Sequence, residues 1–243
     1  MNQVLFYAPT LSSPIKAALG ALRRRGIPSA DHICPEITHV LLEIPAFTPG
    51  GNLRCGGNLD ALLETFPTSA RIIGGGTPPI PLPNYLDLLS DPFYAAKNAA
   101  ITAQCAIGIL AAHVNRAFFD LDILVTGWGR IAKCLARDLT ALGAKVTIFA
   151  RKAYDRAMAE ALGCGALAPE DVSSAHRFDA ILNTVPAFLE LPEADVILEL
   201  ASAPGLGRSD TVIARGLPGR YAPASSGALI AQRILSLCLE EFL

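Results

Sequence analysis

The chain has 243 residues, of which 51% are hydrophobic and 17% are charged. This composition offers enough apolar surface for a packed core and excludes a chain that is disordered throughout. Lysine and arginine total 20 and aspartate and glutamate total 22, so the formal charge at pH 7 is −2. The near-neutral balance does not favour nucleic acid or an anionic membrane surface as a partner.

The first region of the chain alternates short apolar runs with stretches of helical periodicity, and a run rich in glycine and proline follows it. This pattern indicates a small α/β lobe and a linker. The predicted strands are residues 4–7, 38–44 and 70–73, the predicted helices are 13–25 and 59–66, and the linker is 74–83.

The second region begins with a long predicted helix over about 91–116. The strand–helix–strand order that follows predicts a parallel sheet with right-handed crossovers. Strands are expected at 122–126, 145–150, 178–183 and 195–200, and helices at 130–142, 153–162 and 225–242.

We therefore predict two α/β lobes joined by a long helix. The expected parts are a smaller N-terminal lobe (1–90), the connecting helix (91–116), a Rossmann-type domain with a parallel sheet (117–222) and a C-terminal helix (223–243) that packs toward the first lobe. Residues 98–115 carry no formal charge, but Asn98, Thr102, Gln104 and His113 are costly in hydrocarbon. A buried helix is favoured over a membrane span.

The cysteines are scattered, with no C-x-x-C pair and no histidine at ligand spacing. We expect no zinc or other metal site and no disulfide framework, but reduced thiols in a cytoplasmic protein. The six are Cys34, Cys55, Cys105, Cys134, Cys164 and Cys238. The sequence also shows no nucleophile elbow, and no catalytic residue is assigned from it.

A dinucleotide fingerprint stands between the strand at 122–126 and the helix at 130–142. Residues 127–132 read Gly-Trp-Gly-Arg-Ile-Ala and fit the pattern G-x-G-x-x-A. Gly127 permits the tight turn, Gly129 lets the backbone approach a diphosphate, and Ala132 is small enough for the helix to pack on the strand. The helix N-terminus then offers free N–H groups to phosphate. The alternative is a glycine turn that binds nothing.

The end of the next strand carries Arg151 and Lys152 where an NAD site usually has an acid, and no acid follows until Asp155. Because the guanidinium fork suits a phosphate, these residues favour NADP over NAD. The alternative is a pair of solvated surface cations.

Two further loops follow strands and should meet at the same edge of the sheet. The polar pair at the start of 183–186 is expected to run along the ribose and nicotinamide, and the loop 201–205 to face the substrate. Asn98 and Thr102 share one helix face, which could hold a polar substrate. Ordinary turn residues, a helix cap and a core hydroxyl are the alternatives.

Three segments of the chain resemble the A subunit of dipicolinate synthase. They are the helix 98–106, the stretch from Val125 through the fingerprint to Arg151, and the stretch from Ile181 through 199–205 to 217–227. The run Leu-Pro-Gly-Arg-Tyr-Ala-Pro-Ala-Ser-Ser-Gly at 217–227 is the most specific, because it is not generic Rossmann sequence. The likeness covers about Leu82 to the C-terminus.

The resemblance implies an NADP-linked enzyme that oxidises dihydrodipicolinate to dipicolinate, the calcium chelator of bacterial spores. It implies a small dicarboxylate substrate, a homo-oligomer and a flavoprotein-like second subunit. The cofactor residues, from the motif and the resemblance together, would be Gly127, Trp128, Gly129, Arg130, Ile131, Arg151, Lys152, Asn183, Thr184, Val185 and Pro186. The substrate-side residues would be Asn98, Thr102, Ser202 and Ser226.

One departure from the family pattern stands in the long helix. Gln104 and Cys105 occupy the positions of the family's glutamate and glycine. An amide cannot accept a proton as a carboxylate can, so a catalytic role of this position would be lost or altered here. Two alternatives to a dipicolinate synthase activity therefore stay open. These are a dehydrogenase of another small acid and a non-catalytic, nucleotide-binding regulatory or scaffold subunit.

Overall fold

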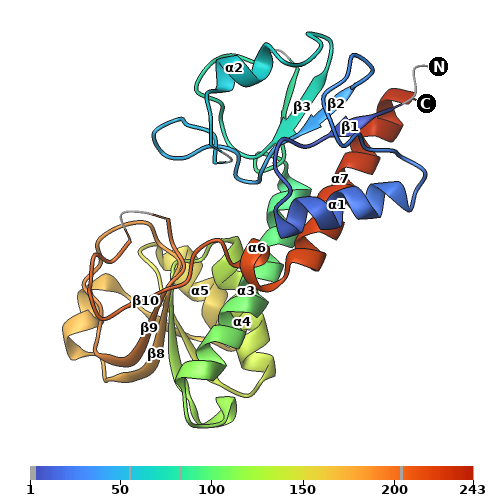
Figure 1. Cartoon of the computed structure of the whole chain (residues 1–243). Coiled ribbons are helices and arrows are strands. Elements are labelled where there is room, and N and C mark those ends of the chain that lie inside the picture. Colours follow the sequence, from blue (N-terminus) through green and yellow to red (C-terminus); the bar gives the residue numbers. More distant parts are fainter. Residues whose placement is uncertain (1–3, 55, 83, 203–204, 243) are drawn as a thin grey trace. The chain divides into compact units, whose positions relative to one another are not determined.

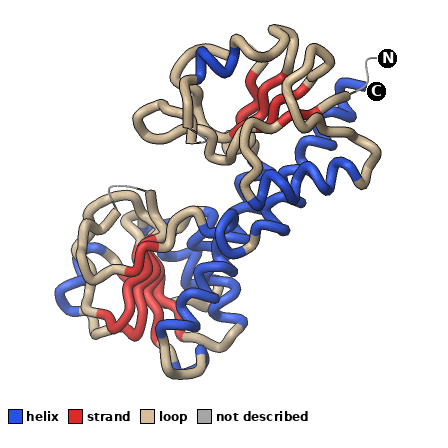
Figure 2. The backbone as a smooth tube through the Cα atoms, viewed as in Figure 1, coloured by secondary structure: helices blue, strands red, loops and turns tan. Residues whose placement is uncertain are grey.

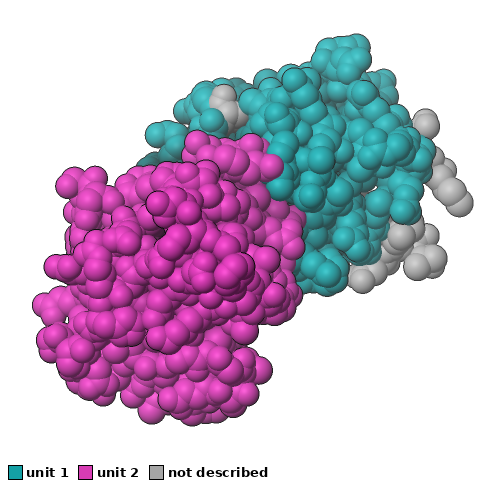
Figure 3. All heavy atoms as spheres, turned by 90° about the horizontal axis from the view of Figure 1, so that it is seen from below, with its two compact units in different colours: residues 1–98, 222–243 teal, residues 99–221 magenta. Residues whose placement is uncertain are grey.

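The structure is a computed structural model that describes residues 4–54, 56–82, 84–202 and 205–242, the last five of them without their side chains. Cys55, the Cys238 side chain, and Ala203 and Pro204 of the predicted substrate loop lie outside the described residues. The chain divides into two compact units: unit 1 is Met1–Asn98 with Ala222–Leu243, and unit 2 is Ala99–Tyr221 (Figure 3).

Unit 1 contains a four-stranded parallel sheet with the order β1-β2-β3-β4. Its strands are β1 (Phe6–Tyr7), β2 (His39–Leu41), β3 (Arg71–Gly74) and β4 (Tyr85–Asp87). The first three follow from their apolar runs. β4 was not expected, because its three half-buried residues directly follow the proline-rich run that reads as linker. Pairing with β3, rather than local sequence, makes it a strand.

Three helices complete unit 1: α1 (Ser13–Arg23), α2 (Leu59–Leu63) and α7 (Pro223–Phe242). Helices α1 and α7 pack against each other (Figure 1). At their contact a Cβ on Gly227 would lie 2.5 Å from both the Ala17 Cβ and the Pro14 carbonyl oxygen. The glycine that ends the most specific part of the family likeness is therefore required by close helix packing.

Helix α3 (Pro92–His113) crosses the boundary between the two units, which falls after Asn98. In the described part of the chain it is the one helix long and apolar enough to cross a membrane by length and composition. Ala103, Ala106 and Leu110 of this helix are fully buried in the core of unit 2. Of its most apolar 18-residue window 28% is buried, so the core covers only part of this helix.

Unit 2 contains a six-stranded parallel sheet with the order β10-β9-β8-β5-β6-β7. Figure 2 shows its strands in red. The predicted α/β class with a Rossmann-type parallel sheet is confirmed. The strands are β5 (Asp122–Thr126), β6 (Lys145–Phe149), β7 (Gly165–Leu167), β8 (Phe178–Asn183), β9 (Ala194–Glu199) and β10 (Val212–Ile213). The helices are η1 (Phe118–Asp120), α4 (Arg130–Ala141), α5 (Ala153–Ala161), η2 (Pro169–Ser174) and α6 (Leu217–Tyr221).

The two edge strands of this sheet and helix α6 were not expected from the sequence. β7 has three residues and β10 has two, which is too short for either a buried run or an alternating pattern to stand out. The central strands β5 and β8 lie at the predicted positions, and their residues Ile123, Val125, Ala180 and Leu182 are fully buried.

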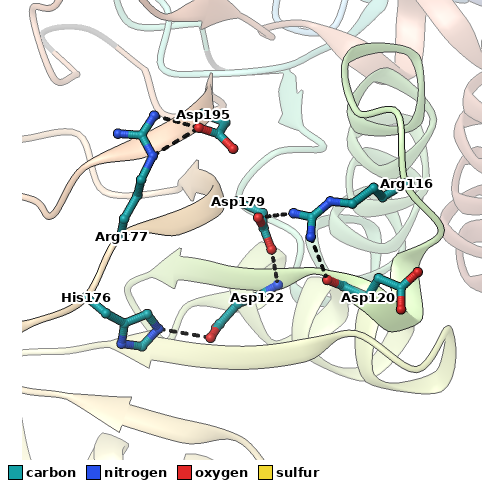
Figure 4. Close-up of polar contacts among 7 residues, drawn as sticks. All are labelled: Arg116, Asp120, Asp122, His176, Arg177, Asp179 and Asp195. Atoms are coloured by element: carbon teal, nitrogen blue, oxygen red, sulfur yellow. Dashed lines mark hydrogen bonds and ion pairs between the residues drawn. The ribbon is translucent and has the colours of Figure 1, made fainter.

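Ion pairs hold together the amino ends of the central strands (Figure 4). Asp179 of β8 accepts a hydrogen bond from the backbone N–H of Asp122 in β5 at 2.7 Å and forms an ion pair with Arg116. His176 lies 2.9 Å from the carboxylate of Asp122. Because all strands are parallel, this edge is opposite to the one at which the predicted dinucleotide loops gather.

Candidate functional site

The carboxyl edge of the unit 2 sheet carries three buried polar residues at the ends of neighbouring strands. Thr126 ends β5, Asn183 ends β8 and Glu199 ends β9. The strand register places Asn183 beside Thr126 on one side and beside Glu199 on the other. Their exposed fractions are 0%, 0% and 2%. We call these three residues the polar row.

Hydrogen bonds connect the polar row from end to end. The Thr126 hydroxyl donates to Oδ1 of Asn183 at 2.5 Å, and Nδ2 of Asn183 donates to Oε1 of Glu199 at 2.8 Å. Asn183 also receives the Val185 N–H at 3.1 Å and donates to the Val185 carbonyl at 3.0 Å. Both ends of the amide are thus engaged inside the protein. Asn183 is placed to shape the loop behind the site rather than to offer atoms outward.

Glu199 is the residue that sequence reasoning missed. Besides Asn183, its carboxylate accepts hydrogen bonds from the backbone N–H groups of Ala201 at 3.0 Å and Leu206 at 2.7 Å. A buried carboxylate is tolerated where several donors surround it. The available signal was an acid directly after the apolar run Val196–Leu198, which ordinary turn chemistry also explains.

The fingerprint turn is packed closely against the loop that follows β8. Gly127 has φ +82°, a conformation that favours glycine. A Cβ there would lie 2.9 Å from Cγ2 of Val185 and 3.2 Å from the Thr184 hydroxyl. Thr184 in turn donates its hydroxyl to the Thr126 carbonyl at 2.6 Å and its N–H to the Thr126 hydroxyl at 3.0 Å. The turn after β5 and the loop after β8 are therefore held against each other by packing and hydrogen bonds.

The N-terminus of α4 is open to an anion. Gly129 is its N-cap and supplies no side chain, and the first turn of the helix contains no acid. No described heavy atom lies within 4 Å of a Cβ built on Gly129. Free N–H groups and the positive end of the helix dipole are the features that bind phosphate. The predicted role of this turn fits its geometry.

Three cations border this helix end and the neighbouring turn after β6. Arg130, Arg151 and Lys152 are exposed. In the ranges that the structure describes, none of the three forms an ion pair. Arg156 donates to the carbonyls of Ala150 at 2.8 Å and Arg151 at 2.9 Å, which holds the backbone of the turn. Exposed cations of this kind can bind anionic groups such as phosphates.

The Trp128 side chain borders a groove between α4 and α5. Its ring is half-buried, with Nζ of Lys133 5.7 Å from the ring centroid. The groove has a volume of about 690 Å³, and Tyr154, Met158 and Leu162 form part of its apolar lining. The neighbouring Ile131 packs against the core of unit 2. Trp128 and Ile131 can therefore meet a ligand at the turn through their backbone, while their side chains lie against the protein.

The four expected substrate-side residues are divided between the units. Asn98 and Ser226 belong to unit 1, and Thr102 and Ser202 belong to unit 2. Thr102 and Ser226 are buried, at 8% and 5% exposed. Asn98 is half-buried and Ser202 is exposed in the loop after β9. Within unit 2 it is thus Ser202 that presents a hydroxyl to solvent beside the polar row.

The described residues contain no group of three or more histidine, cysteine, aspartate or glutamate side chains that could hold a metal ion. Burial raises the pKa values of the Cys105 and Cys164 thiols, which disfavours their thiolate forms. Neither cysteine is therefore placed as a metal ligand or as a nucleophile.

The sheet order, the fingerprint turn and the polar row define unit 2 as a Rossmann-like domain, the class of α/β domain that binds dinucleotides. No family model matches the chain. The A subunit of dipicolinate synthase from Bacillus subtilis (strain 168) is 27% identical over 164 residues, which cover 60% of this chain and 54% of that relative. The match thus spans about half of the relative's length.

Solved structures extend the similarity to the whole chain. The dipicolinate synthase A subunit from Bacillus halodurans has a TM-score of 0.78 at 19% identity and covers 97% of this chain and 98% of its own. Its counterpart from Bacillus subtilis has a TM-score of 0.78 at 20% identity, covering 99% and 97%. Transhydrogenase from Sinorhizobium meliloti has a TM-score of 0.68 at 12% identity, covering 96% and 92%. The expected resemblance to the A subunit of dipicolinate synthase is confirmed. The three solved structures have the same fold as this chain.

Proposed function

We propose that unit 2 binds a nicotinamide dinucleotide at the carboxyl edge of its sheet, with NADP preferred to NAD. The observation that carries the proposal is the glycine turn between β5 and α4. It leads to a helix N-terminus without a side-chain cap, and unpaired cations border it in the described part of the chain.

Each part of the edge has a proposed role. The turn of Gly127, Trp128, Gly129, Arg130 and Ile131 binds the diphosphate through backbone N–H groups and the helix end. Arg151 and Lys152 bind the 2′-phosphate. Thr184, Val185 and Pro186 run along the ribose and nicotinamide, with Asn183 behind them. The bound cofactor supplies hydride chemistry, and the protein supplies binding and orientation.

We further propose that the protein is an NADP-dependent oxidoreductase subunit of the dipicolinate synthase type, which converts dihydrodipicolinate to dipicolinate. The support is the similarity to the A subunit of dipicolinate synthase in sequence and fold. Within unit 2, backbone N–H groups with Thr102 and Ser202 would hold a small dicarboxylate substrate. Asn98 and Ser226 of unit 1 remain proposed substrate-side residues. A homo-oligomer, a cytoplasmic location and a flavoprotein-like second subunit belong to the same proposal.

The test uses Trp128, which is the only tryptophan and stands inside the turn. Purified protein is titrated with NADPH and with NADH while its fluorescence is followed. Saturable quenching that is much tighter with NADPH is the expected result. Equal affinities would overturn the 2′-phosphate assignment but retain the dehydrogenase. A folded protein that binds neither would overturn the proposed dinucleotide site.

Gln104 favours a second candidate, a non-catalytic subunit that binds a nucleotide or a partner. It is exposed on α3 at the position where the family pattern has a glutamate. The variant Gln104→Glu separates the candidates: new or faster turnover of a dihydropyridine dicarboxylate would indicate a lost catalytic acid. A dehydrogenase of another small acid would instead show turnover with a different substrate in the unchanged protein.

A further inference from the structure

We propose that Glu199 is a positioning residue that sets the shape of the nicotinamide half of the site without touching the cofactor. The inference rests on the dinucleotide binding proposed above and assigns a role to a residue outside the fingerprint. It starts from the location of Glu199 at the end of β9, where only 2% of the residue is exposed.

The carboxylate of Glu199 joins two loops that are separate in sequence. Through Oε1 it accepts the Asn183 amide at 2.8 Å, and that amide holds the loop after β8 through Val185. The same oxygen accepts the Ala201 N–H at 3.0 Å, and Oε2 accepts the Leu206 N–H at 2.7 Å. One buried side chain thereby sets the distance between the loops after β8 and β9.

The surroundings leave this carboxylate no freedom to move. Arg215 donates from Nε to the Ala201 carbonyl at 2.5 Å and so holds the same loop from its other side. Gly205 has φ +64°, and a Cβ there would lie 2.6 Å from Oε2 of Glu199 and 2.8 Å from an Arg215 nitrogen. A rearrangement of the carboxylate would therefore break hydrogen bonds in both loops.

The strand order indicates which half of a bound dinucleotide lies near the loops that Glu199 holds. After β5 the chain adds β6 and β7 on one side of that strand and then β8, β9 and β10 on the other, so the strand order switches between β5 and β8. A dinucleotide lies across such a switch point with one nucleotide on each side. The turn after β6 with Arg151 belongs to one side, and the loops after β8 and β9 belong to the other. Glu199 should therefore control the nicotinamide side and leave the adenine side unchanged.

Ser202 gives the inference a link to the substrate. This exposed serine follows Ala201 directly, and Ala201 is held by both Glu199 and Arg215. The proposed substrate hydroxyl is therefore placed by the same carboxylate that shapes the nicotinamide side.

The test compares two ligands that differ in the nicotinamide. NADPH carries both halves, whereas 2′-phospho-ADP-ribose keeps the adenine, the 2′-phosphate and the diphosphate. The main variant is Glu199→Gln, which keeps the shape but must turn an NH₂ group toward at least one of the three donors. We expect NADPH affinity to fall by about tenfold, as for the loss of one buried hydrogen bond, and 2′-phospho-ADP-ribose affinity to change less than about twofold.

Two further variants make the result decisive. Asp195→Asn changes an exposed acid near the amino end of β9 and should alter neither affinity. Arg215→Lys removes the Nε donor to Ala201 and should cause the same selective loss of NADPH affinity. It serves as the test variant in case Glu199→Gln does not fold. Equal weakening of both ligands, or no change with either, would overturn the positioning role. Wild-type protein that bound neither ligand would overturn the proposed function and this inference together.

Discussion

Val185 leaves no room for a side chain at Gly127 on the carboxyl edge of the unit 2 sheet, because a Cβ built on the glycine would lie 2.9 Å from Cγ2 of the valine. This packing joins the turn after β5 to the loop after β8, two segments that lie 58 residues apart in sequence. It shows that the first fingerprint glycine is required by tertiary packing as well as by its backbone conformation.

This packing separates the roles of the two fingerprint glycines. Gly127→Ala should lower both the unfolding free energy and NADPH affinity, because its φ of +82° alone costs about 1–3 kcal/mol for a residue other than glycine. Gly129→Ala should cost less, about 0.5–1 kcal/mol, because alanine is a poorer N-cap than glycine, whereas its φ is −79° and no described atom lies within 4 Å of the new methyl group. Its methyl group should still lower NADPH affinity by about tenfold or more, because the backbone must approach the diphosphate closely.

Urea unfolding and Trp128 fluorescence titration of both variants check this prediction. The stability difference is read from folded protein without ligand, and the affinity from the titration. A Gly129→Ala protein destabilised as much as Gly127→Ala, or one that binds NADPH as tightly as wild type, would contradict it.

Arg151 should discriminate between the two nicotinamide cofactors. Arg151→Ala is expected to weaken NADPH binding by about 10- to 100-fold and NADH binding by less than about twofold, because a lost charge-assisted contact to the 2′-phosphate affects one ligand alone. Arg177→Ala is the matched control, since Arg177 is an exposed arginine paired with Asp195 at the opposite edge of the sheet. Parallel loss of affinity for both cofactors would show that Arg151 does not bind the 2′-phosphate.

His39 should make the stability of unit 1 depend on pH. Burial of its ring, with a smaller contribution from Arg71, lowers its pKa from 6.5 to about 4. Between pH 6.5 and about 4, His39 is protonated in the unfolded chain but stays neutral in the folded chain. The free energy of unfolding therefore falls as the pH falls through this range. Above pH 6.5 the group is neutral in both states. The total loss is about 3 kcal/mol at about 1.4 kcal/mol per pKa unit.

Urea unfolding at several pH values between 7.5 and 4.5 measures this loss. His39→Gln should flatten the pH dependence, and His32→Gln, which alters an exposed histidine, should not. An unchanged slope in the His39→Gln variant would assign the acid sensitivity to other groups.

The ion pair of Asp179 should affect stability without affecting the site. Asp179→Ala removes the partner of Arg116 and an acceptor of the Asp122 N–H, so we expect a loss of about 1–2 kcal/mol in unfolding free energy. Part of the difference from wild type should disappear in 1 M NaCl, because salt screens the half-exposed pair. NADPH affinity should stay within about twofold. A clear loss of affinity would mean that the two edges of the sheet are coupled.

The fingerprint and the central strands of unit 2 were readable from sequence because each depends on a local pattern. Strand β5 matches the predicted bounds, and the glycine turn lies where the spacing placed it. The edge strands β4, β7 and β10 were not predicted. Each is a short segment that becomes a strand through pairing with its neighbour in the sheet.

The amino-acid sequence alone was sufficient for the α/β class, the glycine turn after β5 and the cations after β6. It predicted Asn183 as a cofactor contact without showing the hydrogen-bonding role that this residue has in the fold, and it assigned no role to Glu199. Both roles follow from strand register, which places the ends of β5, β8 and β9 side by side and brings donors from separate loops onto one buried carboxylate. Such contacts join residues distant in sequence, so only the folded sheet decides them.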